Sequence, residues 1–271
     1  MSRYVIKGDT LKTILDKPSI VKNVNIITGF PDNSEMGIYS IKEYKQYLNK
    51  FLSHIFENFQ DPNNFIIFLQ TDKIAKKRGL WLDKSHIILS IADKFDFNLV
   101  WHKTVLYSDS ESYPQYMHYL CLSKTKKNED FMKKYSSPSV ILGGNKIYKN
   151  SFPMYFLNDA INFIKKEGKS KTVVDLFCGS GIVLAMANYF GLNSLGIDIS
   201  EDQVKISKEI KITDEMMKNI KDIEKKNQEL YKLIKAGPYI MDIDFKPNKI
   251  SRSKPKNTFF KKKSMTKKNK K

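Results

Sequence analysis

The sequence contains few cysteines and no long apolar run. Only Cys121 and Cys178 occur among its 271 residues, too few for a disulfide framework and typical of a reducing compartment. The first residues, MSRYVIKGDT, form no apolar run of signal-peptide length, and no stretch approaches the ~20 apolar residues of a membrane span. We therefore expect a soluble intracellular protein, cytoplasmic or nuclear, with no membrane partner.

The sequence also lacks the motifs of several common ligand sites. The phosphate-binding pattern G-K-[ST] is absent, and the turn around Gly179 and Gly181 has Leu184 where a dinucleotide-binding motif has a third glycine. The histidines at positions 54, 86 and 118 show no metal-ligand spacing, so we predict no metal site.

Acidic residues are absent from the C-terminal tail. The net charge is +18, and residues 246–271 carry 11 lysines, one arginine and no acid. Removing these 12 charges leaves +6 for residues 1–245, so the body is only modestly basic. We expect a disordered tail that binds phosphates nonspecifically or acts as a nuclear address, with a merely solubilising end as the alternative.

Residues 172–200 combine a strand, a glycine turn, a helix and a second strand in the sequence TVVDLFCGSGIVLAMANYFGLNSLGIDIS. The first strand ends near Asp175, the glycines break the pattern, and the second strand ends at Asp198. Such a unit has parallel strands, so both strand ends reach one edge of the sheet. Helix N-terminal amides and a carboxylate at that edge suit a nucleoside-containing cofactor.

Strand-like and helix-like segments alternate along the chain, which predicts an α/β sandwich around a mostly parallel sheet. The expected strands are residues 3–9, 24–28, 64–70, 97–107, 115–123, 172–176 and 193–199. The expected helices are residues 12–22, 40–59, 83–95, 152–166, 182–190 and 201–235.

The turn from Asp175 through Phe177 and Gly179 to Gly181 resembles motif I of S-adenosylmethionine-dependent methyltransferases, in the D-x-F-x-G-S-G form. That form is typical of enzymes that methylate exocyclic amines of nucleic-acid bases. The turn lies two-thirds along the chain, although it usually opens such a domain. Residues 3–210 are similar to the permuted β-class of DNA amino-methyltransferases, which methylate adenine N6 or cytosine N4.

Further family signals occur in the family's order along the chain. They are Val5-Ile6-Lys7-Gly8-Asp9-Thr10-Leu11, Gly29–Asp32, Trp101-His102-Lys103, Cys121-Leu122-Ser123-Lys124 and Pro153. The resemblance implies a Rossmann-like class I methyltransferase fold, circularly permuted, with a mostly parallel seven-stranded sheet and an antiparallel final hairpin.

The resemblance also implies where S-adenosyl-L-methionine binds. Asp9 would lie beside the adenine, and Asp198 with Ile199 beside the ribose. Asp175 and the turn residues would hold the methionine moiety, and these turn residues are Phe177, Cys178, Gly179 and Gly181. Asp9 has an alternative reading as a helix cap.

The expected catalytic segment departs from the family pattern. The family has Asp, Asn or Ser, then Pro-Pro, then an aromatic that stacks on the flipped base. Aligning Pro31 with the second proline places Gly29 at the polar position, Phe30 at the first proline and Asp32 at the aromatic. Three hypotheses follow. In the first, Asp32 or Glu35 accepts hydrogen bonds from the substrate or acts as a base, and Phe30 stacks on the substrate base. In the second the substrate is not a base amine, and in the third the pocket is inactive. Ordinary turn chemistry is the alternative interpretation of residues 32–34.

The segment that the family uses for target recognition spans only residues 125–150 here, too few to read several base pairs. We therefore predict a methyltransferase acting on DNA or RNA with low intrinsic sequence selectivity, or one that depends on a partner subunit. The alternatives are an inactive nucleic-acid-binding subunit of a complex and a methyltransferase for another substrate. The expected domains are a methyltransferase domain (1–200), a helical extension (201–240) and the basic tail (241–271).

Overall fold

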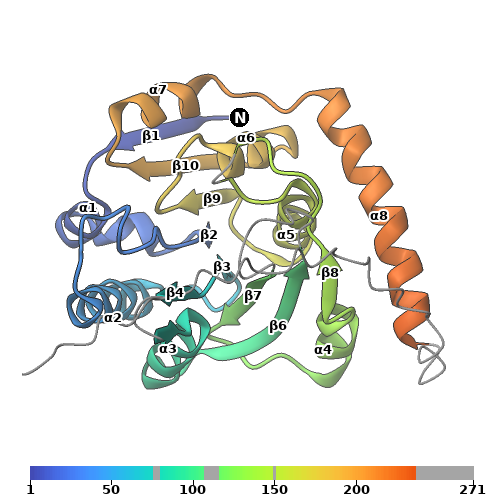
Figure 1. The fold of residues 1–271 in the computed structure, drawn as a ribbon, viewed down its shortest axis with the longest axis horizontal. Coiled ribbons are helices and arrows are strands. Elements are labelled where there is room, and N and C mark those ends of the chain that lie inside the picture. Colours follow the sequence, from blue (N-terminus) through green and yellow to red (C-terminus); the bar gives the residue numbers. More distant parts are fainter. Residues whose placement is uncertain (76–79, 107–115, 149–150, 236–271) are drawn as a thin grey trace, which may run out of the picture. The chain divides into compact units, whose positions relative to one another are not determined.

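The computed structural model describes residues 1–75, 80–106, 116–148 and 151–235, and the predicted basic tail lies outside these ranges. Residues Met1–Lys232 form one compact unit, built on an eight-stranded sheet (Figure 1). Its strands are β1 (Arg3–Lys7), β2 (Asn25–Thr28), β3 (Ile66–Gln70), β6 (Asn98–Leu106), β7 (Tyr116–Ser123), β8 (Val140–Leu142), β9 (Thr172–Asp175) and β10 (Asn193–Asp198). Their order across the sheet is β1-β10-β9-β2-β3-β7-β6-β8.

Helices cover both faces of this sheet, as the alternating sequence pattern predicts (Figure 1). One face carries α1 (Thr10–Asp16), α2 (Ile41–Asn58) and α3 (Lys84–Ala92). The opposite face carries α4 (Glu129–Ser136), α5 (Met154–Glu167) and α6 (Ile182–Tyr189). Successive strand residues alternate between the two cores: Ile26 and Ile66 pack with α2, whereas Ile27 and Ile67 pack with α5.

The predicted strand count of seven is wrong, because the main sheet contains eight strands. The antiparallel pair β6–β7 is present, but β8 pairs with β6 in parallel and makes the sheet edge. This three-residue strand gives little sequence signal beside the polar residues around it. A second, two-stranded sheet joins β4 (Lys73–Ala75) to β5 (Leu80–Leu82).

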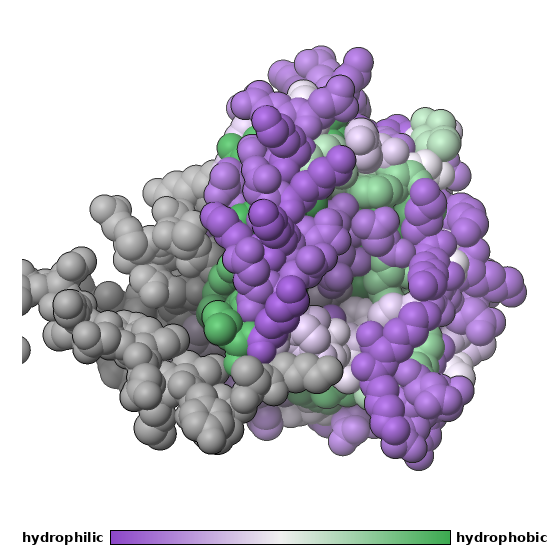
Figure 2. Space-filling view, turned by 90° about the vertical axis from the view of Figure 1, so that its right-hand side faces the viewer, coloured by the Kyte–Doolittle hydropathy of each residue, from purple (hydrophilic) through white to green (hydrophobic). Residues whose placement is uncertain are grey.

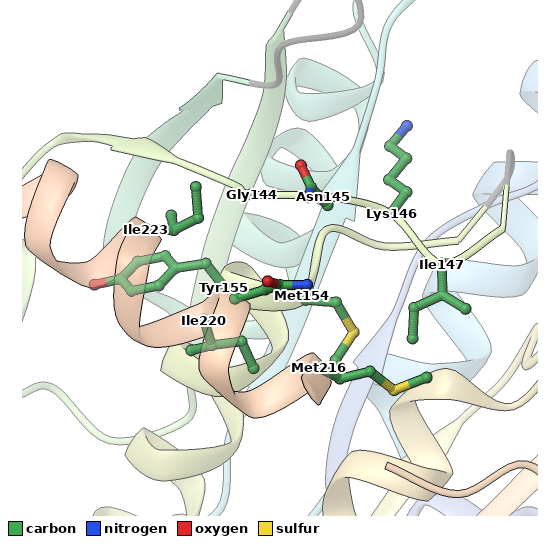
Figure 3. Close-up of a pocket in the computed structure, with 10 residues that line it drawn as sticks. Gly144, Asn145, Lys146, Ile147, Met154, Tyr155, Met216, Ile220 and Ile223 are labelled. Atoms are coloured by element: carbon green, nitrogen blue, oxygen red, sulfur yellow. The ribbon is translucent and has the colours of Figure 1, made fainter. Parts of the chain in front are cut away.

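The single helical region expected at residues 201–235 is two helices, α7 (Glu201–Glu209) and α8 (Asp214–Lys235). The apolar residues of α8 face the start of α5 across a small cavity of about 200 Å³, where Ile220 and Ile223 lie near Tyr155 (Figure 3). Hydrophilic side chains dominate the surface on the right-hand side of Figure 1, with smaller hydrophobic patches between them (Figure 2). None of the described helices is long and apolar enough to cross a membrane.

Candidate functional site

A cleft of about 860 Å³ lies at the carboxyl ends of β1, β2, β3, β9 and β10. Of the residues predicted for the site, all except Gly181 line it. They are Asp9, Gly29, Phe30, Pro31, Asp32, Asp175, Phe177, Cys178, Gly179, Asp198 and Ile199. Segments separated by up to about 190 residues in sequence therefore meet at one sheet edge, where open α/β folds bind ligands.

The glycine turn is fastened to the end of β10. The backbone N–H of Gly179 donates to Asp198 Oδ2 at 2.8 Å, and the N–H of Ser200 donates to Oδ1 at 2.8 Å. Gly179 has a φ of +49° and no atom within 4 Å of the position that a Cβ would occupy. The turn therefore leaves space for a ligand against its backbone.

Gly181 has a packing role in this structure. Its φ is +81°, and a Cβ there would lie 2.5 Å from the Cβ of Ser207 in α7. The residue therefore allows α7 to approach the start of α6, and it does not line the cleft.

The thiol of Cys178 points toward β10. A Cβ on Gly196 would lie 2.7 Å from its sulfur, so the thiol packs against this glycine. Burial, together with the Asp175 and Asp198 carboxylates, raises the pKa of the thiol well above its ordinary value. A nucleophilic thiolate is disfavoured here.

Asp175 is a buried carboxyl at the end of β9. The hydroxyl of Thr28 donates to its Oδ1 at 2.9 Å, and the N–H of Phe177 donates at 3.2 Å. Burial is the largest cause that raises its pKa to about 7, with the Asp198 carboxylate acting in the same direction against these two hydrogen bonds. Asp175 therefore exchanges its proton near neutral pH.

We expect Asp175→Asn to stabilise the fold more at high pH than at low pH. The folded pKa of about 7 exceeds the ordinary value of 3.8, so between these values the folded state holds a proton that the unfolded state lacks. Stability contributed by Asp175 therefore falls as pH rises from about 4 to about 7. Urea unfolding of both proteins near the two ends of this range, at about pH 4 and at about pH 7, measures this, and a pH-independent difference between them would contradict it.

Asp9 both caps a helix and lines the cleft. Its carboxylate accepts the N–H of Lys12 at 2.7 Å at the start of α1, so the capping interpretation is correct. The next residue ties this helix to the turn, because the hydroxyl of Thr10 donates to the carbonyl of Leu176 at 2.6 Å. The exposed side chain of Ile199 lies on the same cleft.

The cleft carries an excess of acidic side chains. Asp9, Glu35, Asp175 and Asp198 line it together with Asp32, whereas Lys146 is the one basic side chain among its described lining residues. A cationic cofactor with a ribose suits these side chains, because carboxylates attract positive charge and accept hydrogen bonds from hydroxyl groups.

The segment after β2 is held in place through its backbone. Gln70 clamps Phe30: its Oε1 accepts the Phe30 N–H at 2.6 Å, and its Nε2 donates to the Phe30 carbonyl at 3.3 Å. The buried hydroxyl of Tyr44 donates to the carbonyl of Pro31 at 2.7 Å. These contacts make residues 30–31 a rigid rim of the cleft.

The side chains of this segment differ from the family pattern in a way that packing explains. A Cβ on Gly29 would lie 2.6 Å from the Leu69 carbonyl oxygen and 3.0 Å from the Phe152 ring, so the position has no room for a polar side chain. The ring of Phe30 is only 6% exposed and packs against Phe68 and other aromatics. This placement does not favour the predicted stacking of Phe30 on a base.

Asp32 forms an ion pair with Lys84, a buried residue that was not among the predicted site residues. Its Oδ1 lies 2.7 Å from Lys84 Nζ, and the Lys84 side chain is 0% exposed whereas that of Asp32 is 31% exposed. The N–H of Asp32 also donates to Glu35 Oε2 at 2.7 Å. The buried ammonium group of Lys84 therefore holds the Asp32 carboxylate in one direction.

Lys84, Gln70 and Tyr44 were not predicted as part of the site. Lys84 follows Asp83 at the start of a helix, where a lysine ordinarily reaches solvent, and only the long-range contact with Asp32 reveals its role. A glutamine at the end of an apolar strand gives a weak signal of a polar function at the sheet edge.

Residues 12–209, more than two-thirds of the chain, match a protein-family model described as DNA methylase. A second model, described as D12 class N6 adenine-specific DNA methyltransferase, matches residues 157–270. A comparison with curated proteins gives no match.

Solved structures share the fold at low sequence identity. PvuII DNA methyltransferase, a cytosine-N4-specific enzyme, is 15% identical with a TM-score of 0.62, over 84% of this chain and 93% of that chain. TTHA0409 from Thermus thermophilus, assigned as a DNA modification methylase and solved with S-adenosyl-L-methionine, is 16% identical with a TM-score of 0.56, over 81% of this chain and 96% of that chain.

The family match and the fold agree with the resemblance seen in residues 172–200 and in the order of the other motifs. The chain belongs to the DNA methylase family, and it is an S-adenosylmethionine-dependent methyltransferase.

Proposed function

We propose that this protein methylates an exocyclic amino group of a nucleic-acid base, with DNA as the main substrate. One observation carries the proposal: the glycine turn, Asp9 and Asp198 line the same cleft as residues 29–32. A cofactor on the first set and a flipped base against the second would therefore lie next to each other.

The proposed cofactor contacts follow the edge of the sheet. Asp198 would accept the ribose hydroxyls through the remaining lone pairs of its carboxylate, and Asp9 would lie beside the adenine. The backbone at Phe177, Cys178 and Gly179 would face the methionine moiety, with Asp175 below it. Bound S-adenosylmethionine supplies the electrophilic methyl group.

Asp32 is the proposed contact for the acceptor amine. The ion pair with Lys84 fixes the direction of this carboxylate, while Gln70 and Tyr44 hold the backbone that carries it. A fixed carboxylate can accept a hydrogen bond from the amino group and so orient the nitrogen lone pair toward the methyl group; the amine then loses a proton after the methyl group is transferred. Catalysis then rests mainly on positioning.

Low intrinsic sequence selectivity is also proposed. Part of residues 125–150 belongs to the fold: β8 completes the sheet, and Phe131 and Tyr135 of α4 pack against Phe163. The remainder is too short to read several base pairs. A partner subunit or recognition of nucleic-acid shape would then supply target choice, and RNA remains a second substrate class to test.

We also propose a circularly permuted architecture and three segments along the chain. Circular permutation is supported by the position of the glycine turn after β9, late in the chain. We retain a methyltransferase domain at 1–200, a helical extension at 201–240 and a basic phosphate-binding arm at 241–271. Residues 236–271, which include the end of the extension and the whole arm, lie outside the described residues.

The first experiment is calorimetric titration of the full chain with S-adenosylmethionine. We expect micromolar affinity, weakened at least ~10-fold in Asp198→Asn, which loses a charge but retains an acceptor for the turn. Asp202→Asn is the matched control, because this exposed residue of α7 lies outside the cleft.

Transfer of labelled methyl groups to double-stranded DNA, single-stranded DNA and RNA then identifies the substrate. Product on DNA supports the proposal, and product on RNA alone would replace DNA with RNA. Cofactor binding without transfer to any of them would indicate a cofactor-binding subunit that needs a partner. Absence of cofactor binding by folded protein would overturn the proposed site.

A further inference from the structure

Three side chains with metal-binding groups converge outside the residues that line the cleft. They are Asp72, which follows β3, Asp83, which caps α3, and His118, in β7. One ligand atom from each lies within 4.8 Å of those from the other two. Their spacing in the sequence gives no indication of this, because each comes from a different element.

The separation of two of these atoms suits a shared metal ion. His118 Nε2 lies 3.3 Å from Asp72 Oδ2. Two ligands bound to one tetrahedral Zn²⁺ at about 2.0–2.1 Å stand roughly 3.4 Å apart. Asp72 and His118 therefore need little movement to become neighbouring ligands.

Each of the three side chains is already oriented by a further hydrogen bond. The Lys84 N–H donates to Asp72 Oδ1 at 3.2 Å, on the oxygen that is not the one near His118, and the His86 N–H donates to Asp83 Oδ1 at 2.9 Å. Trp81 Nε1 donates to Asp72 Oδ2 at 2.8 Å, so a bound metal ion would share this oxygen with it. The second ring nitrogen of His118 lies 2.9 Å from His102 Nε2. Ligating histidines and carboxylates in metal sites have outer partners of this kind, which fix the ring and the carboxylate in place.

The cluster holds two carboxylates, and its one potential cation is the His118 imidazole, which is charged only when it is protonated. Asp72 is only 6% exposed, and in the described part of the chain no lysine or arginine side chain pairs with the carboxylate of Asp72 or Asp83. The nearby Lys84 contributes its backbone N–H to Asp72, whereas its ammonium group pairs with Asp32. A divalent cation would neutralise the two carboxylates.

A metal-free chain of hydrogen bonds from Asp72 through His118 to His102 accounts for two of the three ligands. Capping of α3 orients the Asp83 carboxylate, and this carboxylate also comes within reach of the same point. We propose that Asp72, Asp83 and His118 together bind one divalent transition-metal ion of the Zn²⁺ type. Mixed imidazole and carboxylate donors favour such an ion over Mg²⁺ or Ca²⁺.

The test uses the full-length protein, stripped of metal with a chelator and titrated with Zn²⁺. We expect one tightly bound equivalent and a rise in the melting temperature. Asp83→Asn should weaken binding at least ~10-fold, because asparagine still caps α3 but is a poor ligand. His118→Gln should do the same, whereas His86→Gln, a control for surface histidines, should bind like the wild type.

Bound Co²⁺ gives an independent readout, since imidazole and carboxylate ligation produces a visible absorption band that both cluster variants should lose. Absence of stoichiometric Zn²⁺ binding by folded wild-type protein would overturn the proposal, as would unchanged binding in Asp83→Asn. Neither measurement depends on methyl transfer, so the metal site and the proposed function succeed or fail separately.

Discussion

Asp32→Ala should reduce the free energy of unfolding by roughly 3 kcal/mol, an unusually large loss for a side chain that is 31% exposed. The reason is its partner. Lys84 Nζ lies 2.7 Å away on a side chain with 0% exposure, so removal of the carboxylate takes this counter-charge away from a buried cation. Chemical denaturation of the purified variant measures the loss.

The double variant Asp32→Ala/Lys84→Met provides the control. Methionine fills a similar volume without a charge, so the double variant should be more stable than Asp32→Ala alone. A double variant that is no more stable would contradict the ion-pair explanation. The result also governs how activity is interpreted, because a weakly folded Asp32→Ala protein would appear inactive for structural reasons. Asp32→Asn is therefore the better catalytic variant.

Gly29→Ser, which restores a residue type found in the family, should also destabilise the protein, by about 2 kcal/mol or more. The new Cβ would lie 2.6 Å from the backbone carbonyl of Leu69 and 3.0 Å from the Phe152 ring, and backbone cannot move aside as a side chain can. Thermal and urea unfolding measure the change. We expect no gain in methyl transfer from the added hydroxyl.

Gly8→Ala is the matched control for this substitution. Gly8 follows β1 at the same edge of the sheet, and its added Cβ would meet only the Thr13 hydroxyl oxygen, at 3.0 Å. It should therefore cost less than Gly29→Ser. Phe152→Leu combined with Gly29→Ser should recover only part of the stability, because the Leu69 carbonyl remains in place. Wild-type stability of Gly29→Ser would show that the segment rearranges easily.

The parts of the site that follow a local pattern could be predicted from the sequence. The strand, glycine turn and Asp198 lie within 30 residues of one another, so periodicity and turn chemistry locate them. The cleft edge also follows, because parallel strands end together. The eighth strand was missed because β8 is three residues long and takes its stability from pairing with β6.

The contacts that shape the divergent segment could not be predicted in this way. Lys84 meets Asp32 across 52 positions, and Gln70 meets Phe30 across 40. Burial of a lysine depends on the tertiary neighbours that surround it, which no local propensity encodes. The same holds for the Asp72, Asp83 and His118 cluster, whose members have no recognisable spacing along the chain.

The pairing of β1 with β10 has a consequence for synthesis on the ribosome. Arg3 pairs with Ser194 and Lys7 with Asp198, and β10 is the one strand of the described sheet next to β1. The first strand therefore emerges some 190 residues before its partner, an interval of roughly 10–40 s at about 5–20 residues per second. A nascent chain halted before β10 would contain residues 29–32 and the glycine turn but not Asp198, the residue proposed to contact the ribose. Binding of the cofactor would thus report that translation has passed residue 198.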